Sequence, residues 1–373
     1  MDTNKQVYLK GLNGMRAIAA FGVMLSHINI TLDRHNIHNV SLFGFEKGLP
    51  RGWSLGEQGV TIFFVLSGFI ITYLLLLEKD KKGTINQRHF YIRRILRIWP
   101  LYYLYLFLAI IVFYFTTHAT PDITILSFYF LLLANIPFIL EKAFFYCGQL
   151  WSIAVEEQFY LFWPFLFRKK INLEKTLIQL IIAFTVVRLF LWIFFPFQFF
   201  TTLLTVNRFD CMMFGGLIAI YYYKKSGIIK LITSLPFQLF AWIVLAVHVF
   251  NFEIVNSIIS MELITLATGF IICGQISNKN KIINLENRIL NFLGKYSYGI
   301  YIYHHILIYI CSKSNIYGGI ENEVIRTLFI FITIVCGTIA VAYISYEMIE
   351  KRFIKLKDKF SVVQSTTSLE VEK

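Results

Sequence analysis

The sequence predicts an all-α fold: a polytopic membrane helix bundle of about ten transmembrane helices plus a re-entrant segment. Composition is the first observation, because 57% of the 373 residues are hydrophobic and only 15% are charged, against about 45–50% and about 25% in ordinary globular proteins. The mean hydropathy is +0.63. The second observation is a series of apolar stretches of roughly 20 residues, the length that crosses a bilayer as a helix. The third is that Lys and Arg collect in every second loop between these stretches, which is typical of cytoplasmic loops.

Ten apolar stretches are expected to cross the membrane. They lie at 7–30, 57–77, 98–117, 148–167, 176–195, 209–223, 236–253, 255–276, 297–312 and 323–348. An eleventh apolar stretch, 123–140, is expected to be re-entrant or interfacial. A full crossing there would move the basic cluster Arg168–Lys170 to the wrong side of the membrane. Eleven spans remain the competing interpretation.

The charge pattern also predicts the orientation and the partners. Both termini are expected in the cytoplasm, with the loop 31–56 outside. Residues 1–358 form one membrane-embedded domain, and 359–373 form a polar, disordered cytoplasmic tail. The net charge of +13 is explained by this orientation, so membrane lipid and not nucleic acid is the expected partner. The five cysteines lack CxxC spacing, so they indicate small buried side chains, and neither a metal site nor a bound cofactor is expected.

The first span contains two ionisable residues, Arg16 and His27. Such groups are costly inside a span and therefore indicate function. They are eleven positions apart, about 20° from three full turns and roughly 16 Å along the axis, so they share one helix face. This favours a cavity lined by both. The alternative is that Arg16 extends to the inner interface and His27 lies at the outer headgroup region.

Two further groups of polar residues stand close to the membrane. Ser152 and Glu156 are at i and i+4 in a predicted helix and share a face. Arg93, Arg94 and Arg97 crowd the start of the third span, and guanidinium groups fit phosphate oxygens bidentately. The alternatives are a structural ion pair for Glu156, and topology anchoring or binding of anionic lipid headgroups for the arginines.

Weaker signals come later in the chain. Arg208 and Asp210 precede the pair Gly215–Gly216, which favours close helix packing. His304 and His305 lie in the ninth span after several tyrosines. Either histidine could be a polar packing residue.

Six motifs occur in one order along residues 8–355. They are GLNGMRAIAAFGVMLSH, GVTIFFVLSGFIIT, RRILRIWPLY, LWSIAVEEQFYLFWP, RFDCMMFGG and LGKYSYGIYIYHH. Together they resemble the acyltransferase 3 family of membrane O-acyltransferases. The family's Arg-ten residues-His motif corresponds to Arg16 and His27, its Arg-rich motif to the three arginines, and its Ser-three residues-Glu motif to Ser152 and Glu156. Its late tyrosine-rich motif places a histidine at His304.

The resemblance implies a function. Family members take acyl groups, most often acetyl, from cytoplasmic acyl-CoA and transfer them to hydroxyls of surface or lipid-linked carbohydrates such as lipopolysaccharide, exopolysaccharide or peptidoglycan. It therefore implies acetyl-CoA as co-substrate, a glycoconjugate acceptor and a place in the inner (cytoplasmic) membrane. This chain departs from the family at Thr61, where an acidic residue is common. Some relatives add an extracytoplasmic hydrolase-like domain, so this chain is expected to act alone or with a partner protein.

The expected catalytic residues are His27, Glu156 and Arg16. His27 is expected to deprotonate the acceptor hydroxyl, since imidazole titrates near neutral pH. Glu156 would orient His27 or bind the acceptor, and Arg16 would stabilise the oxyanion or hold the donor. The expected substrate-binding residues are Arg93, Arg94, Arg97, Ser152 and His304. Direct transfer and an acyl-enzyme relay both remain open, as do two other functions, a transporter and an accessory membrane subunit.

Overall fold

The computed structural model describes residues 7–31, 45–46, 49–50, 52, 54–167, 171–196, 198–249, 257–314 and 316–363. Within these residues the chain is almost entirely helical, and the only strands are the two-residue pair β1 (Phe45–Glu46) and β2 (Leu49–Pro50). Most of the outer loop 31–56 and of the predicted tail 359–373 falls outside the described residues.

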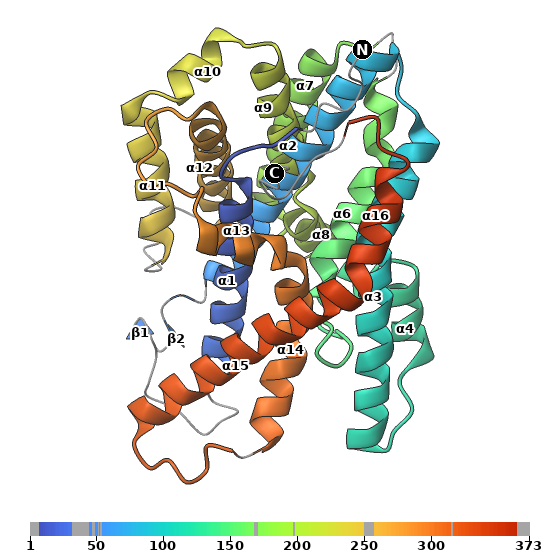
Figure 1. The fold of residues 1–373 in the computed structure, drawn as a ribbon, viewed down its shortest axis with the longest axis vertical. Helices are drawn as coiled ribbons and strands as arrows, with labels where there is room; N and C mark the ends of the chain where they lie inside the picture. Colours follow the sequence, from blue (N-terminus) through green and yellow to red (C-terminus); the bar gives the residue numbers. More distant parts are fainter. Residues whose placement is uncertain are drawn as a thin grey trace, which may run out of the picture.

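Each of the ten apolar stretches contains a long helix in the described part of the chain (Figure 1). They are α1 (Leu12–Ile30), α2 (Leu55–Lys82), α3 (Gln87–Thr117), α6 (Leu150–Phe162), α7 (Leu173–Phe194), α9 (Phe209–Tyr223), α11 (Leu235–Val249), α12 (Ser257–Ser277), α14 (Ser297–Ser314) and α15 (Glu323–Ser345). Shorter elements join or extend them. These are α8 (Phe199–Asn207), α10 (Gly227–Ile232), α13 (Arg288–Lys295), α16 (Lys351–Asp358), the 3₁₀ turn η2 (Trp163–Phe167) and the π-helical turn η3 (Tyr346–Glu350).

Six helical segments of the described residues are long and apolar enough to cross a membrane. Four of them are α2, α3, α7 and α12, and the others join α8 to α9 and α15 to α16. The helices α1, α6, α11 and α14 are shorter or more polar, and α1, α6 and α14 carry the candidate site residues. The all-α membrane fold is therefore confirmed.

The stretch 123–140 is not one helix. It forms α4 (Ile123–Phe130) and α5 (Asn135–Ile139), separated by a turn in which Leu132 has a positive φ of 58°. Eight residues of helix span about 12 Å, far less than the roughly 30 Å hydrocarbon core. The hydroxyls of Tyr102 and Tyr103 on α3 donate to carbonyls of Tyr129 and Phe130, both at 2.9 Å. These bonds give hydrogen-bond donors to backbone carbonyls at the end of α4. This favours the re-entrant interpretation over an eleventh span.

Basic loop ends gather at one end of the bundle. Lys79 at the end of α2 donates to the Phe167 carbonyl at 3.1 Å, and Lys224 after α9 pairs with Glu174 of α7 at 2.5 Å. In Figure 1 the end of α2 lies at the top, as does α10, which follows α9. The loops after the second, fourth and sixth spans therefore lie together, as the charge pattern predicts.

The helix α2 is the centre of the bundle and packs closely on α1 and α9. Its crossing with α9 depends on glycines, because a Cβ on Gly68 would collide with the Met212 carbonyl and one on Gly215 with the Val65 carbonyl. A buried ion-pair cluster joins α7, α9 and α12. Arg188 pairs with Asp210 at 2.7 Å and also with Glu262. This pairing offsets the high free-energy cost of burying these charges.

Candidate active site

A cavity of about 140 Å³ opens between α1, α2, α3, α6 and α14. Five of the eight predicted site residues contribute to its wall, namely Arg16, Arg94, Arg97, Ser152 and Glu156. Apolar side chains from α2 and α3, among them Phe63 and Ile98, complete it. A pocket that is mostly apolar but contains a few convergent charged groups is the usual form of a ligand site.

The arginines of α3 divide between two tasks. Arg94 and Arg97 are at i and i+3, share a helix face and line the cavity. Arg93 points elsewhere: its guanidinium donates to Glu78 and to the Phe360 carbonyl, each at 2.8 Å. Arg93 therefore fastens the start of α3 to α2 and to the chain after α16, and the structure gives it no place in the cavity wall.

Glu156 lies among hydroxyl and guanidinium groups. The Tyr160 hydroxyl donates to Glu156 Oε2 at 2.8 Å and is hydrogen-bonded to Ser67 on α2. The guanidinium of Arg94 lies 5.6 Å from the centre of the Tyr160 ring. Glu156 thus belongs to the arginine-lined cavity, where Tyr160, and not His27, is hydrogen-bonded to it.

Ser152 joins α6 to α14. Its hydroxyl lies 2.6 Å from the Tyr301 hydroxyl, which donates to the Gln149 carbonyl at 2.9 Å. The Ser152 hydroxyl also lies 3.4 Å from the Gln149 carbonyl, so the two hydroxyls and this carbonyl form one small hydrogen-bonded group. Ser152 and Glu156 line one cavity, as their spacing predicts, while Tyr301 connects this wall to the histidines of α14.

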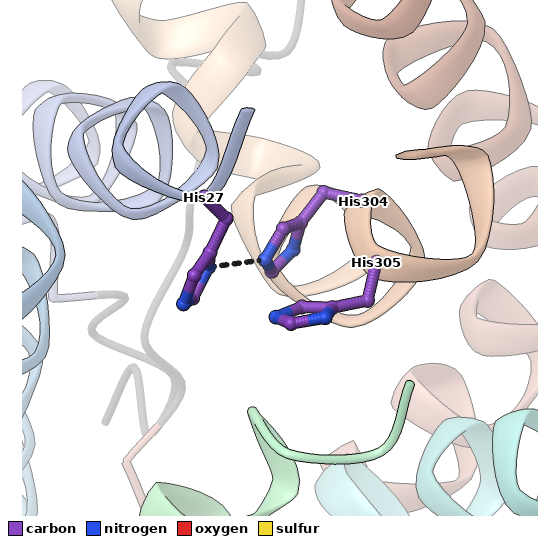
Figure 2. Close-up of side chains that lie close together, drawn as sticks. All are labelled: His27, His304 and His305. Atoms are coloured by element: carbon purple, nitrogen blue, oxygen red, sulfur yellow. Dashed lines mark hydrogen bonds between the residues drawn. The ribbon is translucent and has the colours of Figure 1, made fainter. Parts of the chain in front are cut away.

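Three histidines meet beyond Tyr301 (Figure 2). His27 of α1 lies 2.9 Å from His304 of α14, measured from Nδ1 to Nε2, and the two rings are stacked with an interplanar angle of 12°. His305 meets His27 edge-on, with ring centroids 4.4 Å apart. One nitrogen from each ring lies within 4.8 Å of the others, so the three rings could hold a metal ion.

The hydrogen bonds define which nitrogen of His27 is basic. Nδ1 of His304 lies 3.3 Å from the Ile300 carbonyl, which can only accept a hydrogen bond. We infer that Nδ1 of His304 carries the proton, so that its Nε2 accepts the proton of His27 Nδ1. In this tautomer the lone pair of His27 is on Nε2, and His304, not Glu156, orients the ring.

The structure separates Arg16 from His27. Both are on α1, but Arg16 lines the arginine cavity and His27 belongs to the histidine group. The link between them is Tyr301, which lines the cavity and whose ring centroid lies 5.9 Å from that of His304. With about 16 Å of helix between the two residues, Arg16 is better placed to hold a donor than to contact an oxyanion beside His27.

Sequence reasoning missed several neighbours of the site. Tyr160 could have been found, because it follows Glu156 by four positions and therefore shares its helix face. Ser67 and the contact of His305 with His27 have no local signal, because their partners lie on other helices. Thr61, the departure from the family pattern, accepts a hydrogen bond from Arg208 at 3.0 Å, and Arg208 also pairs with Glu57 at 2.8 Å.

Comparison with known proteins shows what the chain as a whole is similar to. The family model described as an acyltransferase domain matches residues 9–347. A protein of Staphylococcus aureus (strain COL) is 26% identical over 94% of this chain, and the chain spans 58% of that relative's length. The O-acetyltransferase OatA of S. aureus (strain NCTC 8325) is also 26% identical, over 92% of this chain and 57% of its own.

A third relative has a more specific name. The peptidoglycan O-acetyltransferase OatA of Listeria monocytogenes (serovar 1/2a) is 30% identical over 47% of this chain and 27% of its own. No solved structure matches significantly. Its six long apolar helical segments make the chain a multi-pass membrane protein. Because the family model covers nearly its whole length, the chain belongs to the acyltransferase domain family.

Proposed function

We propose that this chain transfers an acyl group, most simply acetyl, from acyl-CoA to a hydroxyl of a surface or lipid-linked carbohydrate. The observation that carries the proposal is the arrangement of two adjoining sites. An arginine-lined cavity suited to an anionic donor adjoins, through Tyr301, a histidine whose free lone pair suits a general base. The names of the relatives support acetyl as the group and a glycan as the acceptor.

The protein lies in the inner (cytoplasmic) membrane with both termini in the cytoplasm, and the donor enters from the basic end of the bundle, which faces the cytoplasm. Arg94, Arg97 and Arg16 bind the CoA phosphates and the polar part of its arm, because guanidinium groups pair bidentately with phosphate oxygens. Glu156, which is hydrogen-bonded to Tyr160, lines the same cavity and offsets part of this positive charge. The thioester then reaches past Ser152 and Tyr301 toward His27.

The reaction is direct transfer at His27. Nε2 of His27 takes the proton of the acceptor hydroxyl while the oxygen attacks the thioester carbonyl. The tetrahedral intermediate collapses, the carbon–sulfur bond breaks, and the CoA sulfur receives the proton from His27. His304 holds the ring in the required tautomer throughout. A general base of this kind contributes about 10²–10⁴-fold.

Replacing two arginines tests the donor site. Arg94→Gln with Arg97→Gln is expected to lower kcat/KM for acyl-CoA by at least about 100-fold, mainly through KM, because each lost charge-assisted bond costs about 1.5–3 kcal/mol. The measurement is CoA release by the purified protein in lipid as acyl-CoA is varied.

Arg93→Gln is the matched control. It should retain the KM for acyl-CoA but lower the melting temperature, because Glu78 and the Phe360 carbonyl lose their partner. A normal KM in the double variant would show that Arg94 and Arg97 only anchor the helix.

A further inference from the structure

We propose that His27, His304 and His305 form a binding site for a divalent transition-metal ion such as Zn²⁺, and that metal occupancy silences acyl transfer. The binding half of this proposal depends only on the geometry of the three rings. The inhibitory half rests on the function proposed above, in which His27 is the base.

The rings are close to the geometry that zinc requires. Zinc lies about 2.0–2.1 Å from imidazole nitrogens, so tetrahedral ligand nitrogens are about 3.4 Å apart. His27 Nδ1 and His304 Nε2 are now 2.9 Å apart, and all three ligand nitrogens lie within 4.8 Å of one another. Side-chain rotations that open the His27–His304 pair by about half an ångström and close the widest pair by up to about 1.4 Å would give this spacing.

The surroundings of His304 match those of a metal ligand. Metal-binding histidines usually donate their second N–H to a carboxylate, a water or a backbone carbonyl, which fixes the ring and its tautomer. Nδ1 of His304 has such a partner in the Ile300 carbonyl, at 3.3 Å on the same helix. Its Nε2 is thereby directed to the point where the other two rings converge, as Figure 2 shows.

The ligand set selects the class of cation. The cluster, as the described residues form it, consists of imidazoles alone, which suit Zn²⁺, Cu²⁺ and Ni²⁺. Ca²⁺ and Mg²⁺ prefer oxygen ligands. Three histidines leave a fourth tetrahedral position for water.

Metal binding and base catalysis exclude each other at His27. A neutral imidazole has one nitrogen lone pair. A bound metal takes this lone pair, whichever nitrogen faces it, so the ring can no longer accept the proton of an acceptor hydroxyl. Zinc at this site would therefore stop transfer without occupying the donor cavity.

The test uses the purified full chain in lipid nanodiscs after treatment with a chelator. The wild type is expected to bind one equivalent of Zn²⁺, to lose transfer activity as zinc is added, and to recover it with EDTA. His305→Gln should bind zinc at least 10–100-fold more weakly, since even outer partners of metal ligands are worth that much. Whatever its activity without metal, the variant should keep that activity at zinc concentrations that silence the wild type.

A matched control and a second measurement make the result decisive. His248→Gln changes a buried histidine on α11, bonded to the Val244 carbonyl at 2.7 Å, and should leave zinc binding unchanged. Co²⁺ should give the wild type visible absorption from low-symmetry coordination. If His305→Gln melts early, His305→Asn takes its place.

Several results would overturn the proposal: a wild type that binds no zinc, one that shows no cobalt spectrum, or a His305 variant that binds zinc as tightly as the wild type. Zinc inhibition that persists in the variant would refute the inhibitory half. A protein that binds zinc but transfers nothing would refute the proposed function and leave the metal site standing.

Discussion

His27→Ala is expected to lower acyl transfer by about 10²–10⁴-fold, the usual contribution of a general base, with normal expression and membrane insertion. The physical reason is the position of the ring. Its Nδ1 is engaged by His304 at 2.9 Å, so Nε2 is the nitrogen that offers a lone pair. Alanine removes that lone pair and leaves the arginine cavity unchanged, so the KM for acyl-CoA should stay close to that of the wild type.

The measurement is acyl-CoA-dependent modification of an acceptor by purified protein in lipid, with folding checked by thermal melting. His248→Gln is the control, because it changes a buried histidine of α11 outside the group of three histidines. Wild-type turnover in His27→Ala would eliminate His27 as the base, and His304 would be the next candidate.

Replacing His304 should show that it positions His27. His304→Leu removes the acceptor of the His27 Nδ1 proton and puts an apolar side chain of similar size in its place. We expect kcat to fall by roughly 10–100-fold, by analogy with the loss of a partner that orients a metal-binding histidine. The KM for acyl-CoA should not change, because His304 does not line the donor cavity.

His304→Gln distinguishes positioning from packing. The side-chain oxygen of glutamine reaches approximately the place of Nε2 and can accept the same proton, so this variant should recover most of the lost kcat. Equal impairment of the Leu and Gln variants would mean that His304 acts through packing alone.

Hydrophobicity and charge predicted the bundle well because each depends on local sequence. Every apolar stretch contains a helix. The hydrogen bonds of Lys79 and Lys224 show that the basic loops after the second, fourth and sixth spans lie together. The break at Leu132 was not predictable in the same way. No glycine or proline marks it, and the turn is stabilised by tyrosines of α3 that bond the end of α4.

In the site, too, contacts within one helix could be predicted from the sequence, whereas contacts between distant helices could not. Helical spacing predicted that Ser152 and Glu156 share a face, and that Arg94 and Arg97 do. Spacing could not show that Arg93 turns to Glu78, nor that His27 meets His304, which is 277 positions away. It also suggested one cavity for Arg16 and His27, whereas the structure divides a shared helix face between two adjoining sites.

The most direct test follows the acyl group itself. Acetyl-CoA labelled in its acetyl group is supplied to the purified chain in lipid vesicles that have glycan fragments on both sides. The account predicts that label appears on glycan hydroxyls as an alkali-labile ester, with one CoA released per acetyl transferred, and that His27→Ala yields neither product. Label that crosses the bilayer with no CoA released and no ester formed would contradict it and identify the chain as a transporter.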